Sequence, residues 1–384
     1  MSCKTNALPR NGGERAILLP TLTPKAPKQR FMESSSAFAK RGWIGATVLA
    51  LSACSSFPPL HYGSDGTFAT PAKGVSTDGT SVTFDVLTYN IEGLQWPARS
   101  GRSGDLARIG RSLKALNDSG NAPDVVLFQE VFSGTAVRAV KASGYPVMVG
   151  GPSRTRSSRD SADAERAGRP RPTKGELGIR LTGSGLVIAS RYPVTVTKMD
   201  PYSRKTCAGF DCLSNKGVML IRIAVPGVPA PIEIVNTHMN AQRASKVKQE
   251  RHLTAHRYQV EELAMFLQRH RSANAPLVLG GDFNMRRSPD RHDAFVSQLP
   301  LEQVHRYCLS SKQCDVRMSW DGDAPWMDTQ DLQFFASSQT VRIVPIRVET
   351  MFDGSPDSPR LSDHDGLRVT YRVSWPRAAG GAAP

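Results

Sequence analysis

Residues 277–285 read LVLGGDFNM, an apolar run that enters two glycines and then delivers Asp282 and Asn284. The apolar run predicts a buried β-strand, because strands buried on both faces lack the alternation of half-exposed ones. Asp and Asn are common turn residues, since their side chains bond the nearby backbone, so a turn alone would explain the pair. The other interpretation is that the strand ends in two polar groups that serve a site, and the remaining strand ends decide between the two.

Strand and helix patterns continue over residues 81–376. Further strands are predicted at 81–90, 123–131, 184–190, 194–199, 217–225, 231–239, 332–337, 340–349 and 366–373. Helical spacing of apolar residues predicts helices at 105–116, 134–143 and 245–271. Many apolar strands with a few helices indicate two sheets packed face to face, with helices covering both outer faces. The expected fold class is therefore α/β, a four-layer sandwich around one core.

Polar residues of a few types stand at the ends of these predicted strands. They are Asn90, Glu130, His238, the pair Asp282 and Asn284, and the segment with Asp363 and His364 before the last strand. Turn chemistry explains any one of them but not all together, and functional residues gather where scaffold strands end. Carboxylate and carboxamide oxygens without a thiolate suit a hard cation, Mg²⁺ or Mn²⁺.

Two histidines in this set suit proton transfer at neutral pH. The sequence contains neither a G-x-S-x-G nucleophile elbow nor a P-loop. A metal that polarises a phosphoryl oxygen, together with a histidine that activates water, describes metal-assisted phosphoester hydrolysis.

Five segments, in this order along the chain, resemble the endonuclease/exonuclease/phosphatase superfamily. They are TYNIEG (88–93), FQEV (128–131), NTHMNA (236–241), GGDFN (280–284) and LSDHDG (361–366). The resemblance covers roughly residues 82–374 and implies a deoxyribonuclease I-like fold. Two further stretches, GSGLVIASRYPV (183–194) and CLSNKGVMLIRI (212–223), resemble neutral sphingomyelinases of the secreted bacterial type.

The resemblance also implies roles for the residues at the strand ends. Glu130 would be the principal metal ligand, with Asn90 close by. His364 would be the general base that takes a proton from water, with Asp363 beside it in the metal or orienting shell. His238 would stabilise or protonate the phosphoryl or leaving oxygen. The pair Asp282 and Asn284 would orient His238 and the phosphate.

The activity that the resemblance implies is a Mg²⁺-dependent phosphodiesterase that acts on sphingomyelin or a related phospholipid and releases the phosphorylated head group. We expect a monomer that meets its lipid substrate at a membrane surface. The alternative is an exported nuclease of the same fold, since a net charge of +15 and a pI of about 9.8 favour nucleic acid. A non-catalytic adhesion protein is a third class, and the complete set of His238, Asp282 and His364 argues against it.

The sequence also departs from the family pattern. The late D-Y-I-F motif of the family is replaced by QDLQFF, in which Leu332 follows Asp331. Trp326 is a weak candidate for lipid contact, and a buried tryptophan is at least as good an interpretation.

The N-terminal residues predict an exported, lipid-anchored protein. Residues 38–54 read FAKRGWIGATVLALSAC, with a basic start, a short apolar region and small residues before Cys54. This resembles the lipobox of bacterial lipoproteins, in which the cysteine is lipidated after cleavage, and an ordinary secretory signal is the alternative. We expect a signal peptide at 32–53, a non-native upstream extension at 1–31, and placement in the outer membrane, with secretion as the alternative.

The remaining segments outside the predicted core carry further expectations. Residues 54–80 are rich in Gly, Ser, Thr and Pro and are expected to be a flexible tether, and 377–384 a disordered tail. Residues 150–175 are rich in Arg, Ser and Pro and are expected to be a mobile surface insertion that either contacts a polyanion or is simply solvated.

Two cysteine pairs and one histidine pair remain. Exported proteins meet an oxidising compartment, which favours two short-loop disulfides over free thiols. The pairs are Cys207 with Cys212 and Cys308 with Cys314. His252 and His256 are spaced i,i+4 on the long predicted helix, where a solvated pair is a better interpretation than a metal site, because no Glu lies between them as in zinc proteases.

Overall fold

A computed structural model describes residues 61–62, 71–95, 98–159, 167–320, 322–356 and 358–377. The predictions for residues 1–31, 32–53 and 378–384, and for lipidation at Cys54, lie outside this part. Contacts divide the chain after residue 53, and residues 54–384 form a compact unit that holds every described element. Each helix in the described ranges is too short or too polar to cross a membrane.

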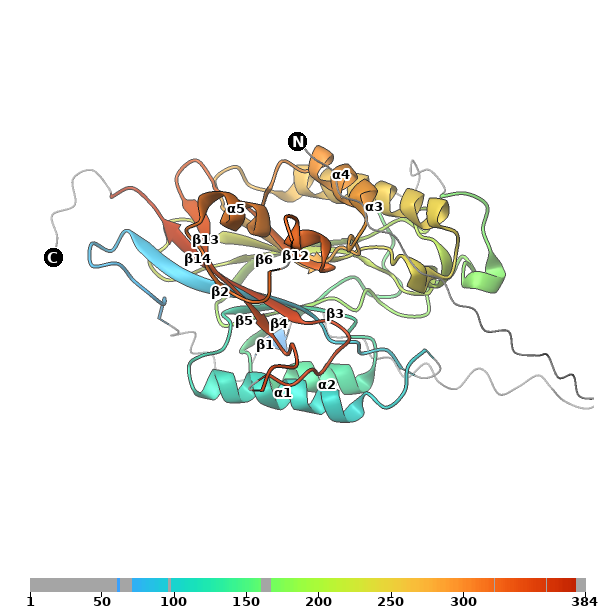
Figure 1. The fold of residues 1–384 in the computed structure, drawn as a ribbon, viewed down its shortest axis with the longest axis horizontal. Helices are drawn as coiled ribbons and strands as arrows, with labels where there is room; N and C mark the ends of the chain where they lie inside the picture. Colours follow the sequence, from blue (N-terminus) through green and yellow to red (C-terminus); the bar gives the residue numbers. More distant parts are fainter. Residues whose placement is uncertain are drawn as a thin grey trace, which may run out of the picture. The chain divides into compact units, whose positions relative to one another are not determined.

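Two β-sheets form the centre of this unit (Figure 1). The first sheet runs in the order β1 (His61–Tyr62), β4 (Val147–Gly150), β5 (Val187–Ser190), β3 (Val125–Gln129), β2 (Ser81–Asn90), β14 (Gly366–Ser374), β13 (Arg342–Met351) and β11 (Asp315–Arg317). The second runs β10 (Glu302–Gln303), β12 (Asp331–Ala336), β9 (Leu277–Asp282), β8 (Ile232–His238), β7 (Gly217–Ile223) and β6 (Val194–Pro201). Both sheets are mixed, because β2 and β3, and likewise β8 and β9, pair in parallel.

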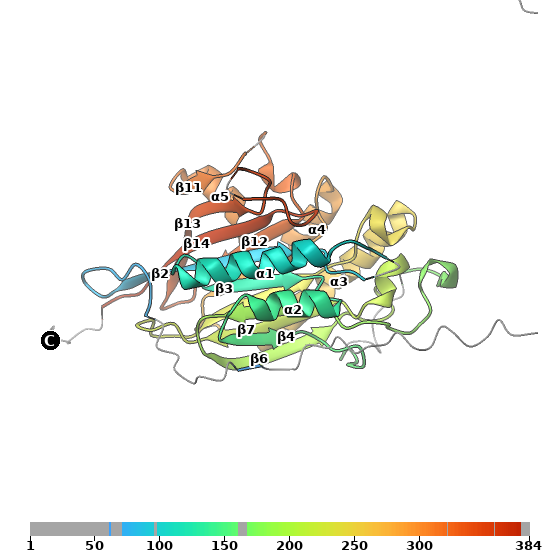
Figure 2. The same ribbon diagram turned by 90° about the horizontal axis from the view of Figure 1, so that it is seen from below.

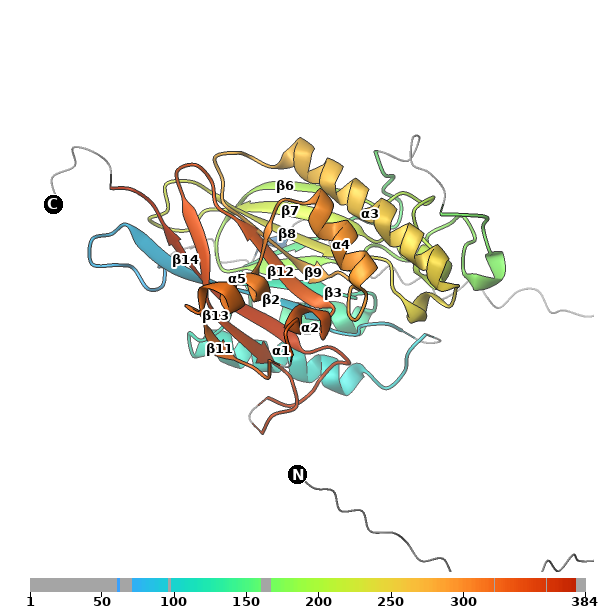
Figure 3. The same cartoon turned by 45° about the horizontal axis from the view of Figure 1, so that its top comes forward.

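Helices cover the outer faces of the two sheets. α1 (Ser103–Asp118) and α2 (Gly134–Ala142) lie over the first sheet, as Figure 2 shows. α3 (Gln249–His270) and α4 (Pro289–Gln298) lie over the second, with α5 (Val304–Ser311) beside them (Figure 3). Short 3₁₀ turns complete the list: η1 (Pro172–Lys174), η2 (Gly209–Leu213), η3 (Arg243–Ser245) and η4 (Pro325–Met327). The predicted four-layer sandwich is confirmed.

The alternation of side chains along β2 shows why the layers form. Val82, Phe84 and Val86 belong to the apolar cluster between the sheets, whereas Leu87 and Tyr89 belong to the cluster under α1 and α2. Successive side chains of a strand point to opposite faces, so a strand that is apolar on both faces needs a neighbour on each side. A third cluster lies between the second sheet and helices α3 and α4.

The two glycines of the GGDFN segment stand where the packing is close. A Cβ atom on Gly280 would lie 2.6 Å from Cδ1 of Leu127 in the opposite sheet. A Cβ on Gly281, whose φ is +152°, would lie 2.1 Å from the carbonyl oxygen of Thr237 in β8. The second contact is with backbone and is sterically impossible, so only glycine fits at position 281, whereas a side chain at position 280 would require Leu127 to move.

The strands and helices expected from the sequence are confirmed, with boundaries that shift by a few residues. The sequence patterns missed β4, α4 and α5 and the short strands β1, β10 and β11. Helix α4 has the sequence PDRHDAFVSQ, in which only Arg291, His292 and Phe295 are buried. Its apolar stripe is too thin to be recognised, because buried charged side chains take the place of apolar ones.

The structure corrects three expectations about the surface. His252 and His256 are buried, with His256 Nε2 2.9 Å from the carbonyl oxygen of Phe283, so they are not a solvated pair. The expected tether is partly folded, because β1 pairs with β4 and Lys73 forms ion pairs with Asp85 and Asp124. The expected insertion at 150–175 is anchored at two positions, since Gly150 belongs to β4 and Ala167 is buried.

Both predicted disulfides are confirmed. Cys207 is bonded to Cys212, and Cys308 is bonded to Cys314. The first closes a loop around η2, and the second ties the end of α5 to the segment that leads into β11.

The buried His305 on α5 makes stability sensitive to acid. Neither ring nitrogen has a hydrogen-bond partner within the described residues, and the ring meets Trp320 edge-on at 5.3 Å between centroids. Burial lowers the pKa of His305 from 6.5 to about 4. The unfolded chain therefore binds a proton that the folded protein excludes, so stability is full above pH 6.5 and falls as the pH drops toward 4.

Replacing this histidine should reduce that loss. The pKa of His305 falls from 6.5 in the unfolded chain to about 4 in the folded protein. At pH 5 this difference lowers the free energy of unfolding by about 2 kcal/mol. We expect His305→Phe, which keeps an aromatic ring against Trp320, to lose about that much less than the parent between pH 7 and pH 5. Urea unfolding at both pH values measures it, and equal losses in the two proteins would contradict the prediction.

Candidate active site

Strand register brings three of the polar strand ends together. Asp282 is the last residue of β9, and it stands opposite His238 in β8 and opposite Asp331 in β12. Side chains at matched positions on neighbouring strands lie on the same face of a sheet. The apolar strand β9 therefore ends at Asp282 in a row of groups that can transfer or bind protons.

The buried carboxylate of Asp282 is the meeting point of the site. Its Oδ2 lies 3.1 Å from Nδ2 of Asn90, 3.3 Å from Nε2 of His238 and 3.9 Å from Nε2 of His364. Its Oδ1 accepts a hydrogen bond from the backbone N–H of Asn284 at 2.9 Å. Since Asn90 comes from the first sheet, this carboxylate joins the two sheets at the site.

The charges around Asp282 control its protonation. Burial by itself would raise the pKa of this carboxyl group, but His238, His364 and Lys216 outweigh it and hold the pKa well below its usual range. Asp282 is therefore a carboxylate at all physiological pH values, and its charge helps to raise the pKa of His364.

His364 is oriented by Asp331. Nδ1 of His364 lies 2.5 Å from Oδ2 of Asp331, and Gln330 Nε2 lies 3.3 Å from the other ring nitrogen. Burial lowers the pKa of His364, but Asp331, Asp282 and Asp363 more than compensate, and the pKa is raised well above its ordinary value. A histidine with a buried carboxylate on Nδ1 keeps Nε2 directed at its target, as in catalytic triads.

Asp363 does not take the orienting role that the sequence suggested for it. Its side chain is 59% exposed, and its Oδ1 lies 3.9 Å from Nε2 of His364, too far for a hydrogen bond. The orienting carboxylate is Asp331. Nothing in the sequence indicated this role, because Asp331 lies in QDLQFF, the segment in which the chain departs from the family motif. The other role expected for Asp363, in the shell of the metal ion, stays a prediction.

Lys216 was also missed. Its Nζ lies 2.9 Å from Nε2 of His238, 2.7 Å from Oδ1 of Asp211, and donates to the carbonyl of Met239 at 3.0 Å. This lysine is almost fully buried, which is uncommon for its type unless it is paired. The signal that could have revealed it is its place in the LSNKG segment of the family resemblance.

Two anchors hold the loops that carry these groups. Arg291 on α4 is fully buried and donates to the carbonyls of Asn240 at 2.6 Å and Asn284 at 3.0 Å, which fixes the segment after β9. Ser362 donates to the carbonyl of Asn90 at 2.7 Å, which fixes the segment before His364 to the end of β2.

Glu130 and Asn90 fit a metal ion by their chemistry. Glu130 directly follows β3, whose last residue Gln129 stands opposite Asn90 in the parallel pair. It holds a φ of +60°, unusual for a residue with a side chain, and its carboxylate makes no hydrogen bond or ion pair within the described residues. Strained backbone at a half-buried, unpaired carboxylate is typical of functional sites.

Other oxygen donors near Glu130 are limited. Among the described residues, no group of three or more His, Cys, Asp and Glu side chains is arranged to hold a metal. Mg²⁺ does not need such a cage, because it keeps several waters and binds through one or two carboxylates together with substrate phosphate. The donors present therefore fit Mg²⁺ or Mn²⁺, and they do not fit a zinc site.

The comparison with known proteins agrees with this geometry. The model of the Endonuclease/Exonuclease/phosphatase family matches residues 87–364, which span β2 to the site histidine. The chain belongs to the endonuclease/exonuclease/phosphatase family, as its motifs predicted. Members of this family are hydrolases that act on phosphodiester bonds and generally depend on divalent metal ions. No curated protein sequence matches the chain.

Solved structures with similar folds include three examples. Sphingomyelinase C from Streptomyces griseocarneus has 18% identity and a TM-score of 0.51, covering 75% of this chain and 99% of that one. A Staphylococcus aureus beta toxin mutant with bound magnesium ions has 16% identity and a TM-score of 0.49, covering 75% and 99%. TDP2 from D. rerio with a single-strand DNA product has 15% identity and a TM-score of 0.49, covering 75% and 98%. The first of these likenesses supports the fold and nothing finer.

Replacing Asp331 should slow turnover without unfolding the protein. In Asp331→Asn the amide cannot hold the His364 imidazole in the same tautomer, so we expect kcat on the soluble diester bis(p-nitrophenyl) phosphate to fall about 10²-fold or more. Asp293→Asn is the matched control, because this carboxylate on α4 is 79% exposed, and the variant should turn over like the parent. A similar loss in the two variants would remove the orienting role from Asp331.

Proposed function

We propose that this protein is a Mg²⁺-dependent phosphodiesterase that hydrolyses sphingomyelin or a related phospholipid and releases the phosphorylated head group. The observation that carries the reaction class is the pair His238 and His364, whose Nε2 atoms lie 3.3 and 3.9 Å from Oδ2 of the buried Asp282. Two histidines and one fixed anion supply what attack of water on a phosphodiester needs, a base for the water and a donor for the leaving oxygen.

The residues of the chain divide the work as follows. His364, held at Nδ1 by Asp331, takes the proton from the attacking water when its ring is neutral, and its raised pKa places that form toward alkaline pH. His238, whose Nε2 lies against Lys216 Nζ, would stabilise or protonate the phosphoryl or leaving oxygen. Asp282 keeps both rings in place, and Asn284 offers a side-chain Oδ1 that makes no hydrogen bond within the described residues. A bound Mg²⁺ or Mn²⁺, held by Glu130 with Asn90 close by, would polarise the phosphoryl oxygen.

The choice of a lipid substrate rests on sequence segments that fall at the site. LSNKG, which resembles the sphingomyelinase branch, carries Lys216, and this lysine lies against His238. A nuclease of the same fold is the second candidate, and the net charge of +15 supports it, because neutralised phosphates contribute most of the affinity for DNA. A monomer acting at a membrane is part of the proposal.

A direct assay separates the two substrates. Purified residues 55–384 should release phosphocholine from sphingomyelin vesicles with Mg²⁺ and should not do so with EDTA. Nicking of supercoiled plasmid is measured in parallel. Release without nicking would support the lipid substrate, whereas nicking alone would leave the reaction class and overturn the substrate.

Glu130→Gln tests the metal ligand within the same assay. Since an amide binds Mg²⁺ far more weakly than a carboxylate, we expect activity to be lost at ordinary Mg²⁺ concentrations. Glu302→Gln is the matched control, because Glu302 is exposed in the edge strand β10. Turnover of the Glu130 variant at the level of the control would exclude Glu130 as the ligand.

Membrane anchoring by Cys54 is the proposed localisation, an outer-membrane lipoprotein, with secretion as the alternative. Stable anchoring needs more than one acyl chain, which lipidation of a lipobox cysteine supplies. Cys54→Ala should move the protein from the membrane fraction to the soluble fraction of the expressing cells, as seen by immunoblot. Continued retention in the membrane fraction would refute the anchor.

A further inference from the structure

Two adjacent loops expose large apolar side chains. Leu177, Ile179 and Leu181 are 51%, 55% and 51% exposed, and Phe210, inside the Cys207–Cys212 loop, is 45% exposed. Together these four side chains, here called the apolar rim, make up half of the large apolar residues exposed in the described part of the chain. Such clustering in a soluble unit marks an interaction surface, since scattered exposure needs no explanation.

Hydrogen bonds and close packing join the two loops into one surface. A Cβ on Gly175, whose φ is +88°, would lie 2.9 Å from the ring of Phe210. The backbone N–H of Leu181 donates to the carbonyl of Leu213 at 2.7 Å. The N–H of Gly209 donates to Oε1 of Glu176 at 2.8 Å. The apolar rim is thus held outward by a fixed backbone and does not result from a loose loop.

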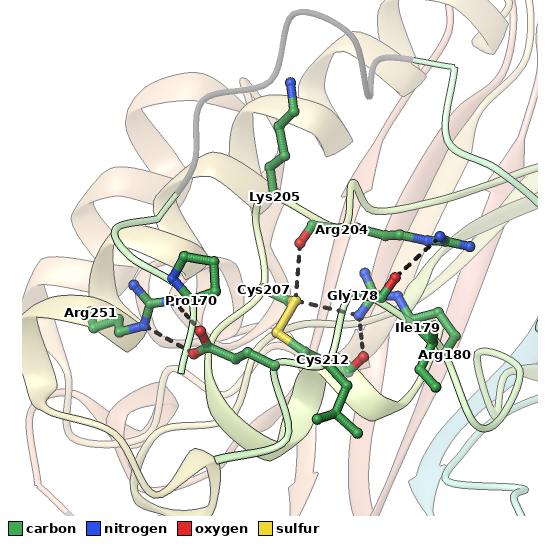
Figure 4. A pocket seen from close by; sticks show the side chains of 11 residues that line it. Pro170, Gly178, Ile179, Arg180, Arg204, Lys205, Cys207, Cys212 and Arg251 are labelled. Atoms are coloured by element: carbon green, nitrogen blue, oxygen red, sulfur yellow. Dashed lines mark hydrogen bonds and ion pairs between the residues drawn. A yellow bond between two sulfur atoms is a disulfide. The ribbon is translucent and has the colours of Figure 1, made fainter. Parts of the chain in front are cut away.

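A pocket of about 240 Å³ opens beside the apolar rim (Figure 4). Four basic side chains line it, Arg180, Arg204, Lys205 and Arg251, against the single carboxylate of Glu176. Figure 4 shows the disulfide at the centre, with Arg180 and Arg204 on one side and Arg251 on the other. Arg251 pairs with Glu176, which leaves the pocket with an excess of positive charge.

The floor of the pocket is rigid. Arg180 is buried and donates to the carbonyls of Cys212 at 2.8 Å and Ser203 at 3.3 Å. Because its guanidinium donates to two backbone carbonyls, this buried arginine fixes the distance between the disulfide loop and the 176–181 loop. The positive charge and the apolar rim therefore keep their relative positions.

We propose that the apolar rim and the basic pocket dock this protein onto an anionic lipid surface. Apolar side chains next to basic ones match the layered chemistry of a membrane interface, in which acyl chains lie below negatively charged phosphates. A protein partner is the weaker fit, because four side chains offer much less than the roughly 800 Å² per partner of a stable complex. Long basic side chains can also place their stems against lipid while the charge stays at the phosphates.

The docking surface is connected to the site through one residue. Asp211, between Phe210 and Cys212, lies 2.7 Å from Lys216 Nζ, and Lys216 contacts His238. The other carboxylate oxygen of Asp211 accepts a hydrogen bond from the backbone N–H of Ala241 at 2.5 Å. A lipid surface that engages Phe210 is thus adjacent to the loop that supports His238. Docking itself does not depend on which phosphodiester the site cleaves.

Vesicle sedimentation in EDTA tests docking without turnover. Residues 55–384 are mixed with vesicles of phosphatidylcholine, or of phosphatidylcholine with phosphatidylglycerol, and the bound fraction is measured. We expect strong preference for the anionic vesicles and weaker binding as salt is raised, since screening shortens the reach of the charges. Leu177→Ser with Ile179→Ser should lower the partition coefficient at least tenfold, and Arg204→Gln with Lys205→Gln should remove the preference for anionic lipid.

Met265→Ser is the matched control, because Met265 is 40% exposed on α3, outside the apolar rim. Its binding should equal that of the parent. All variants should hydrolyse bis(p-nitrophenyl) phosphate like the parent, which shows that they are folded with an intact site. Equal binding to neutral and anionic vesicles, or parental binding by the Leu177 and Ile179 double variant, would overturn the proposal. If the parent binds anionic vesicles but does not hydrolyse sphingomyelin in vesicles with Mg²⁺, the result would instead count against the lipid substrate.

Discussion

The carboxylate of Asp282 is the constraint on which the site depends. It is buried, it is kept ionised by the cations around it, and it receives Asn90 from one sheet and His238 from the other. A buried charge without partners costs several kcal/mol, so removing any of these groups would destabilise the others. The end of β9 and the two sheets are therefore held in one arrangement by the same groups that face the substrate.

The close approach of the two sheets also depends on buried amides. Gln129 in β3 donates to Oδ1 of Asn236 in β8 at 2.8 Å, and Asn236 donates to the carbonyls of Phe128 and Val187. Gln333 in β12 reaches the carbonyl of Val86 across the same interface. Hydrogen-bonded amides in an apolar core favour one register, because a slip would break these bonds. Gly280, which has no side chain, faces Leu127 of the other sheet and lets the two sheets approach closely. The packing of the sheets and the geometry of the site therefore depend on the same strand, β9.

Reaction and docking use different chemistry on one scaffold. The site places His238, Asp282 and Asp331 at the ends of neighbouring strands, where register fixes which side chains meet. The docking surface uses loops that are fixed by a disulfide and by Arg180, where a broad, tolerant contact with lipid is enough. Asp211 belongs to the docking loop and contacts Lys216, so the two regions share one hydrogen-bonded connection. A charged surface of this kind and a phosphodiester site both favour anionic substrates.

Much of the fold and the site could be predicted from the sequence, because they depend on local patterns. Apolar strands ending in Asn90, His238 and Asp282 predicted the sandwich and its polar edge, since strand period and end chemistry are local. Asp331 and Lys216 were missed, because their roles depend on partners 33 and 22 residues away. The burial of His252 and the fold of α4 were likewise decided by Arg291, a charge that only tertiary packing could satisfy. The sequence by itself determined which groups stand at the strand ends, and the tertiary structure decided which of them touch. Register sets the contacts within a sheet and packing sets those between the sheets, and neither follows from spacing along the chain.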